Sequence, residues 1–390
     1  MYLTKDEERI YYGEHGWASQ TCMKILVRLG ELFNATKLIP IKSAHVSGVS
    51  YKTLGDAPIE FLETLADAGA KVRIRATLNP QSFDLEYLGK RLSEHIREKQ
   101  LNILRQFRKM GFTQSLTCTP YYLEKPKQNS HLAWAESSAV VYANSVLGAW
   151  TNREGGPSAL AAAIIGKTPD YGVHKAENRK PNILVDMETP LQNEAEFGAL
   201  GIFLGKILGD KIPIIQGLKD ASEGELKQLG AALATTGMVN MFYHDIRPER
   251  GRIEKISVEA EDIKQTIEKL STTSKTKPDL VFVGCPHCSL DEIRQIAKLT
   301  DGKKVQAGTG FWVCTSRHVK KRAGDYVRQI ESSGGHVLTD MCTIVSWTET
   351  LGIKAMLTNS AKTAYYAPTL NKTETFFAPL KQCLKEVLEG

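Results

Sequence analysis

The sequence predicts an α/β fold with largely parallel sheets. Short runs of apolar and β-branched residues alternate with longer helical patterns along most of the chain, which is the arrangement that gives parallel strands joined by helices. The 390 residues are 42% hydrophobic and 24% charged, an ordinary globular composition with enough length for two or three compact lobes. We place these lobes at residues 1–125, 126–275 and 276–390, with polar, lysine-rich linkers at 124–130 and 271–277.

The first lobe is expected to open with one long helix. The capping box Thr4-Lys5-Asp6-Glu7 starts this helix, and the helical pattern reaches about Phe33. A short strand follows, although Pro40 weakens it. The expected order is then strand 38–42, polar loop 42–51, helix 59–68, strand 71–77, helix 86–110 and strand 115–117.

The rest of the chain repeats the alternation. A glycine-rich turn at 151–157 lies between two helices, and residues 279–284 form the clearest buried strand. Ser289 begins a further capping box. We expect helices at 136–147, 158–166, 194–208, 223–234 and 258–270, from 289 onward, between the last two strands and at 380–388. We expect strands at 182–186, 212–216, 238–243, 279–284, 304–313 and finally 336–341.

Composition argues against several classes of protein. No apolar run approaches the roughly 20 residues that cross a bilayer, and the charged N-terminus lacks a signal-peptide core, so we expect a cytoplasmic protein that does not enter a membrane. Seven cysteines in such a chain indicate free thiols, metal ligands or catalysis rather than disulfides. The net charge of +6 comes from scattered basic residues, which disfavours nucleic acid and suits a small anionic substrate.

Three cysteines stand at the ends of predicted strands. Cys118, Cys285 and Cys342 are far apart in the sequence, yet each follows a strand where α/β sheets bind their ligands. Three thiolates suit a cubane iron–sulfur cluster with one iron left free for substrate. The alternative is that each is a small buried hydrophobe, the usual place of a free cysteine. Position alone leaves both interpretations open.

The other cysteines give weaker signals. Cys285-Pro-His-Cys288 could be half of a zinc site, but no second pair with suitable spacing follows, and nothing else supports a redox dithiol. Cys314 also ends a predicted strand and is the next candidate ligand. Cys22 and Cys383 lie inside predicted helices, where no metal role is expected.

Polar residues gather in the loop at 42–51 and in the region 136–156. Paired glycines beside Arg153 could grip a carboxylate or phosphate through backbone amides and a guanidinium. Serine-rich segments are also ordinary turns and helix caps, and His287 could simply support Cys285. Our catalytic candidates are His45, Ser47, Glu136 and Ser137, and our substrate-binding candidates are Lys42, Ser50, Ser138, Asn144, Asn152, Arg153, Gly155 and Gly156.

Seven segments together resemble the aconitase X family along almost the whole chain. They are Ile39-Pro-Ile-Lys-Ser-Ala-His-Val-Ser-Gly-Val-Ser-Tyr51, Thr117-Cys-Thr-Pro-Tyr121, Ala135-Glu-Ser-Ser-Ala139, Asn144-Ser145, Thr151-Asn-Arg-Glu-Gly-Gly156, Gly284-Cys-Pro-His287 and Asp340-Met-Cys-Thr343. The resemblance implies an aconitase-like catalytic portion of three lobes around an iron–sulfur cluster, expected to be [4Fe-4S] with one iron open to substrate. The implied cluster ligands are Cys118, Cys285 and Cys342.

The resemblance also implies a partner. Aconitase-like enzymes need a swivelling domain that closes the site, and in this family it is thought to bring a catalytic serine. The chain shows no room for it, so a small subunit is expected to supply it in a heterodimer, as in archaea. The implied reaction dehydrates (R)-5-phosphomevalonate to an anhydromevalonate phosphate in the mevalonate pathway. The alternatives are a cis-3-hydroxy-L-proline or other hydroxy-acid dehydratase and, outside the enzymes, a zinc-stabilised binding module.

Overall fold

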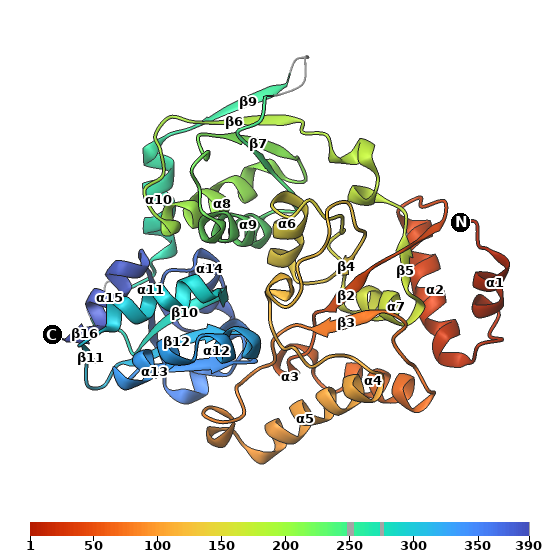
Figure 1. Cartoon of the computed structure of the whole chain (residues 1–390), viewed down its shortest axis with the longest axis horizontal. Helices are drawn as coiled ribbons and strands as arrows, with labels where there is room; N and C mark the ends of the chain where they lie inside the picture. Colours follow the sequence, from red (N-terminus) through yellow and green to blue (C-terminus); the bar gives the residue numbers. More distant parts are fainter. Residues whose placement is uncertain (248–252, 274–276, 390) are drawn as a thin grey trace.

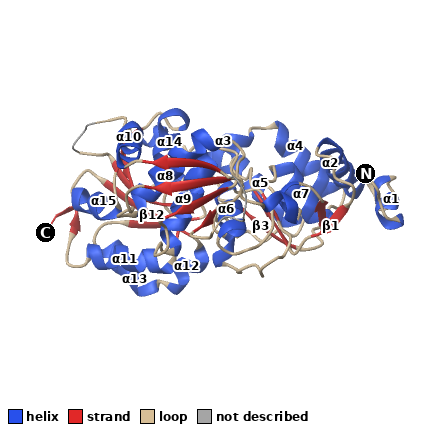
Figure 2. Ribbon diagram, turned by 90° about the horizontal axis from the view of Figure 1, so that it is seen from above, coloured by secondary structure: helices blue, strands red, loops and turns tan. Residues whose placement is uncertain are grey.

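The computed structural model describes residues 1–247, 253–273 and 277–389, so residues 274–276 of the predicted second linker lie outside it. Figure 1 shows three groups of elements around a common centre, with the N-terminal part at the right and bottom, the middle part at the top and the C-terminal part at the left. The chain termini lie at opposite ends of the molecule (Figure 2). The predicted α/β class with largely parallel sheets is confirmed.

The expected long first helix is wrong, because two helices occupy the segment. Thr4 caps α1 (Lys5–Tyr11) with the predicted capping box, but α1 ends before Gly13 and Gly16. Both glycines have positive φ angles, 95° and 84°, which a continuous helix does not contain. Helix α2 (Trp17–Leu32) follows, and its buried face forms part of the core of the first lobe.

The first lobe is built around a small parallel sheet in the order β3-β2-β4, made of β2 (Ser43–Val46), β3 (Arg75–Leu78) and β4 (Ala133–Trp134). The expected polar loop therefore begins as a strand, and the expected strand at 115–117 is absent, with Leu116 at a positive φ of 43°. Pairing of β1 (Leu38–Pro40) with β5 (Lys167–Pro169) extends this lobe beyond residue 125. Its helices are α3 (Tyr51–Leu54), α4 (Ala57–Asp67), α5 (Glu94–Lys109), α6 (Ser137–Ser145) and α7 (Gly156–Ile165).

The middle part has a parallel sheet in the order β8-β7-β6-β9, made of β6 (Ile183–Met187), β7 (Pro213–Gln216), β8 (Tyr243–His244) and β9 (Glu254–Val258). Strand β9 was not predicted. Helix α8 (Glu194–Leu208) packs tightly on α9 (Glu223–Thr236), since a Cβ on Gly201 would lie 2.5 Å from the Cβ of Ala232. Helix α10 (Ala260–Leu270) closes this part.

The third part has a parallel sheet in the order β13-β12-β10-β14-β15, so the prediction that the strands end at residue 341 is wrong. Figure 2 shows its strands between helices above and below. The strands are β10 (Leu280–Cys288), β12 (Gly310–Thr315), β13 (His336–Thr339), β14 (Ala355–Thr358) and β15 (Glu374–Phe377), with β11 (Lys304–Val305) and β16 (Leu388–Glu389) paired apart. The helices are α11 (Leu290–Thr300), α12 (Arg317–Arg322), α13 (Gly324–Ser332), α14 (Ala361–Leu370) and α15 (Leu380–Val387).

Short 3-10 turns join several of these elements. They are η1 (Gly89–Arg91), η2 (Pro120–Tyr122), η3 (Gly172–His174), η4 (Ala176–Arg179), η5 (Thr343–Val345) and η6 (Thr348–Leu351). In the part of the chain that the structure describes, every helix is too short or too polar to cross a membrane.

Candidate active site

The three predicted ligand cysteines come from both sides of the junction between the first and third lobes. Cys118 lies in the loop before η2, Cys285 lies in β10 where its register with β12 shifts, and Cys342 follows β13 and precedes η5. The backbone of Gln81 joins the two lobes here, because its N–H bonds to Asp340 and its carbonyl accepts the N–H of Cys342 at 3.1 Å. A first-lobe segment therefore positions a third-lobe cysteine.

The cysteine side chains are close enough to influence one another electrostatically. Burial raises the pKa of the Cys118 thiol, and the negative charges of Glu136, Cys285 and Cys342 raise it further. Burial and the charge of Cys285 likewise raise the pKa of Cys342. Thiols whose pKa is raised in this way, as in Cys118 and Cys342, would be stabilised as thiolates by a positively charged metal centre.

His287 contacts all three cysteine-bearing segments. Its backbone N–H donates to the Sγ of Cys118 at 3.2 Å, and its Nε2 lies 2.9 Å from the carbonyl of Met341. Because a carbonyl only accepts, Nε2 carries the proton, and Nδ1 accepts from the hydroxyl of Thr117 at 3.0 Å. Burial lowers the pKa of His287 to about 4, so the ring is neutral at pH 7. The sequence predicted that His287 supports Cys285, and these contacts join it also to Cys118 and to the residue before Cys342.

Gly284 lets β10 turn at Cys285. Its φ of 114° lies in the region that favours glycine, and a Cβ there would be 2.3 Å from the carbonyl oxygen of Cys314. The neighbouring strand β12 therefore touches the backbone at this point. A side chain at position 284 would push the strands apart and move Cys285.

Glu136 and Lys362 form a buried ion pair beside the cysteines. Glu136 caps the N-terminus of α6, and its Oε1 accepts from the Nζ of Lys362 on α14 at 2.8 Å. Burial alone would raise the pKa of Glu136, but Lys362 and hydrogen bonds from Asn79 and Ser138 lower it to about 2. The charges of Glu136, Cys285 and Cys342 raise the pKa of Lys362 against the opposing effect of burial. A fixed positive charge therefore faces the cysteine site.

His45 is held in a chain of hydrogen bonds that ends at Glu136. Asn79 donates through Nδ2 to Glu136 at 2.8 Å, so its Oδ1 is the atom 3.3 Å from Nε2 of His45. Nε2 is then the donor, and Nδ1 accepts from Thr77 at 2.8 Å. Burial lowers the pKa of His45 to about 4, which keeps the ring neutral. Both ring nitrogens are occupied in this arrangement.

The structure brings most of the candidate serines to this junction. Ser137 lies 3.4 Å from the Nζ of Lys362, and Ser138 donates to Glu136 at 2.8 Å. Ser50 contacts the carbonyl of Val345 at 2.8 Å, close to Cys342 in the chain. The two predicted polar regions also meet, because a Cβ on Gly156 would lie 2.9 Å from the carbonyl oxygen of Ser47.

Four other substrate-binding candidates have polar groups engaged by the protein itself. Asn144 bonds to the backbone of Thr151 in both directions, and Asn152 bonds to Tyr171 and Val173. Arg153 donates to the carbonyls of Gly237 and Ala234 at 2.7 and 3.0 Å, at the C-terminus of α9. Gly155 is the N-cap of α7, where Ser158 takes its N–H. An anion-gripping role for Arg153 thus remains a prediction.

Lys42 is not brought to the cysteines. It is exposed and lies just before β2. This is the amino end of the strand, whereas the carboxyl end leads towards the cysteines. It lines a different cavity, together with Arg75, Lys125 and Trp134.

Comparison with known proteins decides the family. Profiles of the aconitase X first, second and third domains match residues 1–177, 181–268 and 278–389, which together span most of the chain. The chain belongs to the aconitase X family.

Individual known proteins are similar to nearly the whole of this chain. The phosphomevalonate dehydratase large subunit of Methanocaldococcus jannaschii is 47% identical, with 99% of this chain and all of that protein covered. The cis-3-hydroxy-L-proline dehydratase of Pseudomonas aeruginosa is 32% identical, with 98% of this chain and 69% of that protein covered. The crystal structure of Thermococcus kodakaraensis aconitase X in its holo-form superposes with a TM-score of 0.93 at 42% identity, with 99% and 100% covered.

The donor set fits the iron–sulfur cluster that the aconitase X family implies. Within residues 1–247, 253–273 and 277–389, no three His, Cys, Asp or Glu side chains are grouped closely enough for a single metal ion, which gives no support to a zinc site at Cys285 and Cys288. A cubane cluster holds its thiolates further apart than one ion does. Three thiols within electrostatic reach of one another, with an N–H donated to Cys118, suit such a cluster. Cys22, Cys288, Cys314 and Cys383 are buried.

Sequence reasoning missed Asn79 and Lys362. Asn79 directly follows β3, so the same strand-end argument that selected the cysteines could have found it. Lys362 lies in the first turn of α14, after a strand that was also missed. Its signal was a lysine near a helix start that follows a short apolar strand, which is a common and unspecific pattern.

Proposed function

We propose that this chain is the large subunit of an iron–sulfur hydro-lyase that removes water from (R)-5-phosphomevalonate and gives an anhydromevalonate phosphate. The observation that carries the hydro-lyase proposal is the meeting of Cys118, Cys285 and Cys342 beside the Glu136–Lys362 pair. The substrate proposal is supported by the phosphomevalonate dehydratase large subunits, which are 38–47% identical, against 31–32% for the cis-3-hydroxy-L-proline dehydratases.

The three cysteines would hold a [4Fe-4S] cluster. When bound, such a cluster supplies a Lewis acid for the leaving hydroxyl through the iron without a protein thiolate. Lys362 is placed to bind an anionic group of the substrate, because its charge lies in a buried place where electrostatic attraction is little screened. Ser137, which lies beside Lys362, is placed to donate its hydroxyl to the same group.

We infer that the base which removes the proton next to the carboxylate is supplied by a small partner subunit. Glu136, with a pKa of about 2, is a weak proton acceptor, and both nitrogens of His45 are already hydrogen-bonded. The name "large subunit" of the M. jannaschii relative supports a two-subunit enzyme. The P. aeruginosa relative also supports it, because the match covers only 69% of that longer protein.

The test is an assay of the anaerobically purified two-subunit complex. We expect bound iron, brown colour, and conversion of phosphomevalonate but not of cis-3-hydroxy-L-proline. Lys362→Met should abolish turnover while Lys298→Met, an exposed lysine on α11, leaves it unchanged. A complex with an intact cluster that leaves phosphomevalonate untouched would refute the substrate. Colourless protein with stoichiometric zinc would refute the cluster.

A further inference from the structure

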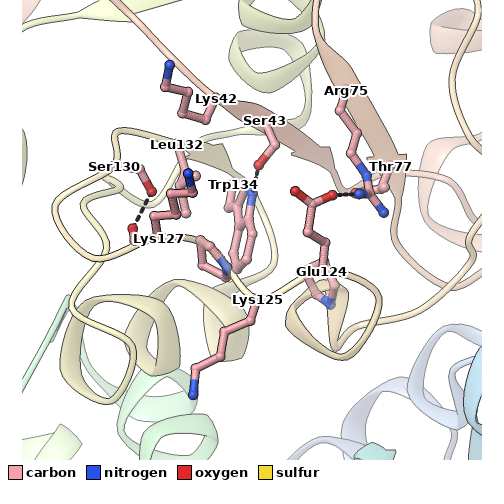
Figure 3. Close-up of a pocket in the computed structure, with 12 residues that line it drawn as sticks. Lys42, Ser43, Arg75, Thr77, Glu124, Lys125, Lys127, Ser130, Leu132 and Trp134 are labelled. Carbon is pink, nitrogen blue, oxygen red and sulfur yellow. Dashed lines mark hydrogen bonds and ion pairs between the residues drawn. The ribbon is translucent and has the colours of Figure 1, made fainter.

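A second cavity lies at the amino end of the strand that carries His45. It has a volume of about 350 Å³ and is enclosed by β2, β3, β4 and the segment from Pro120 to Ser130, as Figure 3 shows. We call it the basic pocket. It is lined by Lys42, Ser43, Arg75, Thr77, Pro120, Glu124, Lys125, Pro126, Lys127, Ser130, Leu132 and Trp134.

The lining of the basic pocket is strongly positive. Lys42, Arg75, Lys125 and Lys127 give four positive charges against the single carboxylate of Glu124, a net charge of +3. Glu124 pairs with Arg75, and among the described residues that line the pocket no other carboxylate accompanies the three lysines. In Figure 3, Lys42 and Lys125 lie on opposite sides of Trp134, and their side chains point away from it. Unpaired ammonium groups around a cavity attract a multiply charged anion.

The floor of the basic pocket is apolar. Figure 3 shows Leu132 and Trp134 near its centre. Pro120 and Pro126 also line the pocket. The indole Nε1 of Trp134 donates to the Oγ of Ser43 at 3.1 Å, which fixes the ring. The hydroxyl proton of Ser43 has no acceptor among the described residues and can point into the cavity. The pocket thus offers a flat hydrophobic surface next to cations and a hydroxyl donor.

We propose that the basic pocket binds a small molecule that carries a phosphate group on an apolar body. A cavity of this size falls within the roughly 300–1,000 Å³ of small-molecule sites, and those sites combine apolar walls with a few charged groups in the same way. The cations provide the phosphate contacts, and Leu132 and Trp134 contact the apolar body. This site lies apart from the cysteines, at the opposite end of β2, and its existence does not depend on the proposed dehydration.

The basic pocket is connected to the cysteine site. Thr77 lines the pocket and is the first donor in the hydrogen-bond chain through His45 and Asn79 to Glu136. Trp134 adds a ring contact to His45, with 6.3 Å between the ring centroids, and Glu136 follows it by two residues. A ligand held against Thr77 and Trp134 therefore touches the groups that hold Glu136 in place.

Isothermal titration calorimetry of the intact two-subunit complex with phenyl phosphate tests the proposal. We expect a dissociation constant below about 1 mM at low salt, and binding at least about tenfold weaker for inorganic phosphate, which lacks the apolar body. The Lys125→Gln/Lys127→Gln variant should raise the dissociation constant at least about tenfold, since it removes two of the four cations. The matched control Lys298→Gln/Lys381→Gln, which removes two exposed lysines elsewhere, should bind as the wild type does.

Three results would overturn the proposal. Phenyl phosphate could fail to bind, or it could bind equally well to the Lys125→Gln/Lys127→Gln variant, which would place it elsewhere, such as beside Lys362. Inorganic phosphate could bind as tightly as phenyl phosphate, which would contradict the role of Leu132 and Trp134. Circular dichroism of each variant checks that the fold is retained. A complex that binds phenyl phosphate as expected but does not dehydrate phosphomevalonate would refute the proposed function and leave the basic pocket standing.

Discussion

Replacing Lys362 by methionine should destabilise the junction between the first and third lobes by about 3 kcal/mol. The side chain of Glu136 belongs to the first lobe and that of Lys362 to the third, and both are largely buried at a separation of 2.8 Å. The pKa of Glu136 falls from 4.5 to about 2 in the folded protein, and a shift of that size corresponds to about 3 kcal/mol. The variant would leave a buried carboxylate with only Asn79 and Ser138 as partners, a situation that typically costs about 3–5 kcal/mol.

A double-mutant cycle measures the interaction itself. Urea unfolding at pH 7 of the wild type, Lys362→Met, Glu136→Gln and the double variant should give a coupling free energy of about 3 kcal/mol, because the double variant leaves no unpaired buried charge. Lys211→Met provides the matched control, since its partner Glu254 is more than half exposed and the loss should stay below about 1 kcal/mol. A coupling below about 1 kcal/mol for the buried pair would show that Lys362 does not determine the charge state of Glu136.

Three further predictions concern the site and its acid sensitivity. Gly284→Ala should cost at least about 2 kcal/mol in urea unfolding, because the new Cβ would overlap the carbonyl of Cys314; equal stability would contradict the strand contact. The pKa of His45 is about 4 in the folded protein against 6.5 in the unfolded chain, so between these pH values only the unfolded state binds the proton. Lowering the pH from 7 to 5 should therefore reduce the free energy of unfolding by about 2 kcal/mol. His45→Asn should make the free energy of unfolding less dependent on pH in this range. Cys118→Ser should lose bound iron in a colorimetric assay while Cys314→Ser keeps it; the reverse result would make Cys314 the ligand.

The structure brings the three predicted cysteines near one another, although the local structure around them differs in part from the prediction. Cys285 and Cys342 lie at β10 and β13, as the strand pattern indicated. Cys118 does not follow a strand, because the preceding segment makes only an isolated bridge from Thr113 to Thr77. It still reaches the site, since that bridge and the bond from Thr117 to Leu78 align the segment with β3. Alignment along a sheet edge, rather than strand formation, placed this cysteine.

Long-range packing explains what the sequence could not show. Arg153 looked like an anion binder because it stands beside two glycines, yet the free carbonyls at the end of α9 take its guanidinium. The reach of Lys362 to Glu136, 226 residues earlier in the chain, depends on where the packing of α14 on α8 and α9 places it. Local patterns carry no information about either contact, because both partners belong to elements whose relative position is set by the packing of whole lobes.

The division of the site between lobes has a consequence for how it forms. His287 contacts Cys118 from the first lobe and the carbonyl of Met341, which precedes Cys342, from the third. Ser50 and Gln81 cross the same junction to Val345 and Cys342. No single lobe therefore contains the complete set of thiols, and the set exists only when the lobes are docked. A cluster that binds all three cysteines would stabilise the docked arrangement by mass action, since it binds the folded form alone. With such a cluster, docking of the lobes and binding of the cluster would be coupled in one equilibrium.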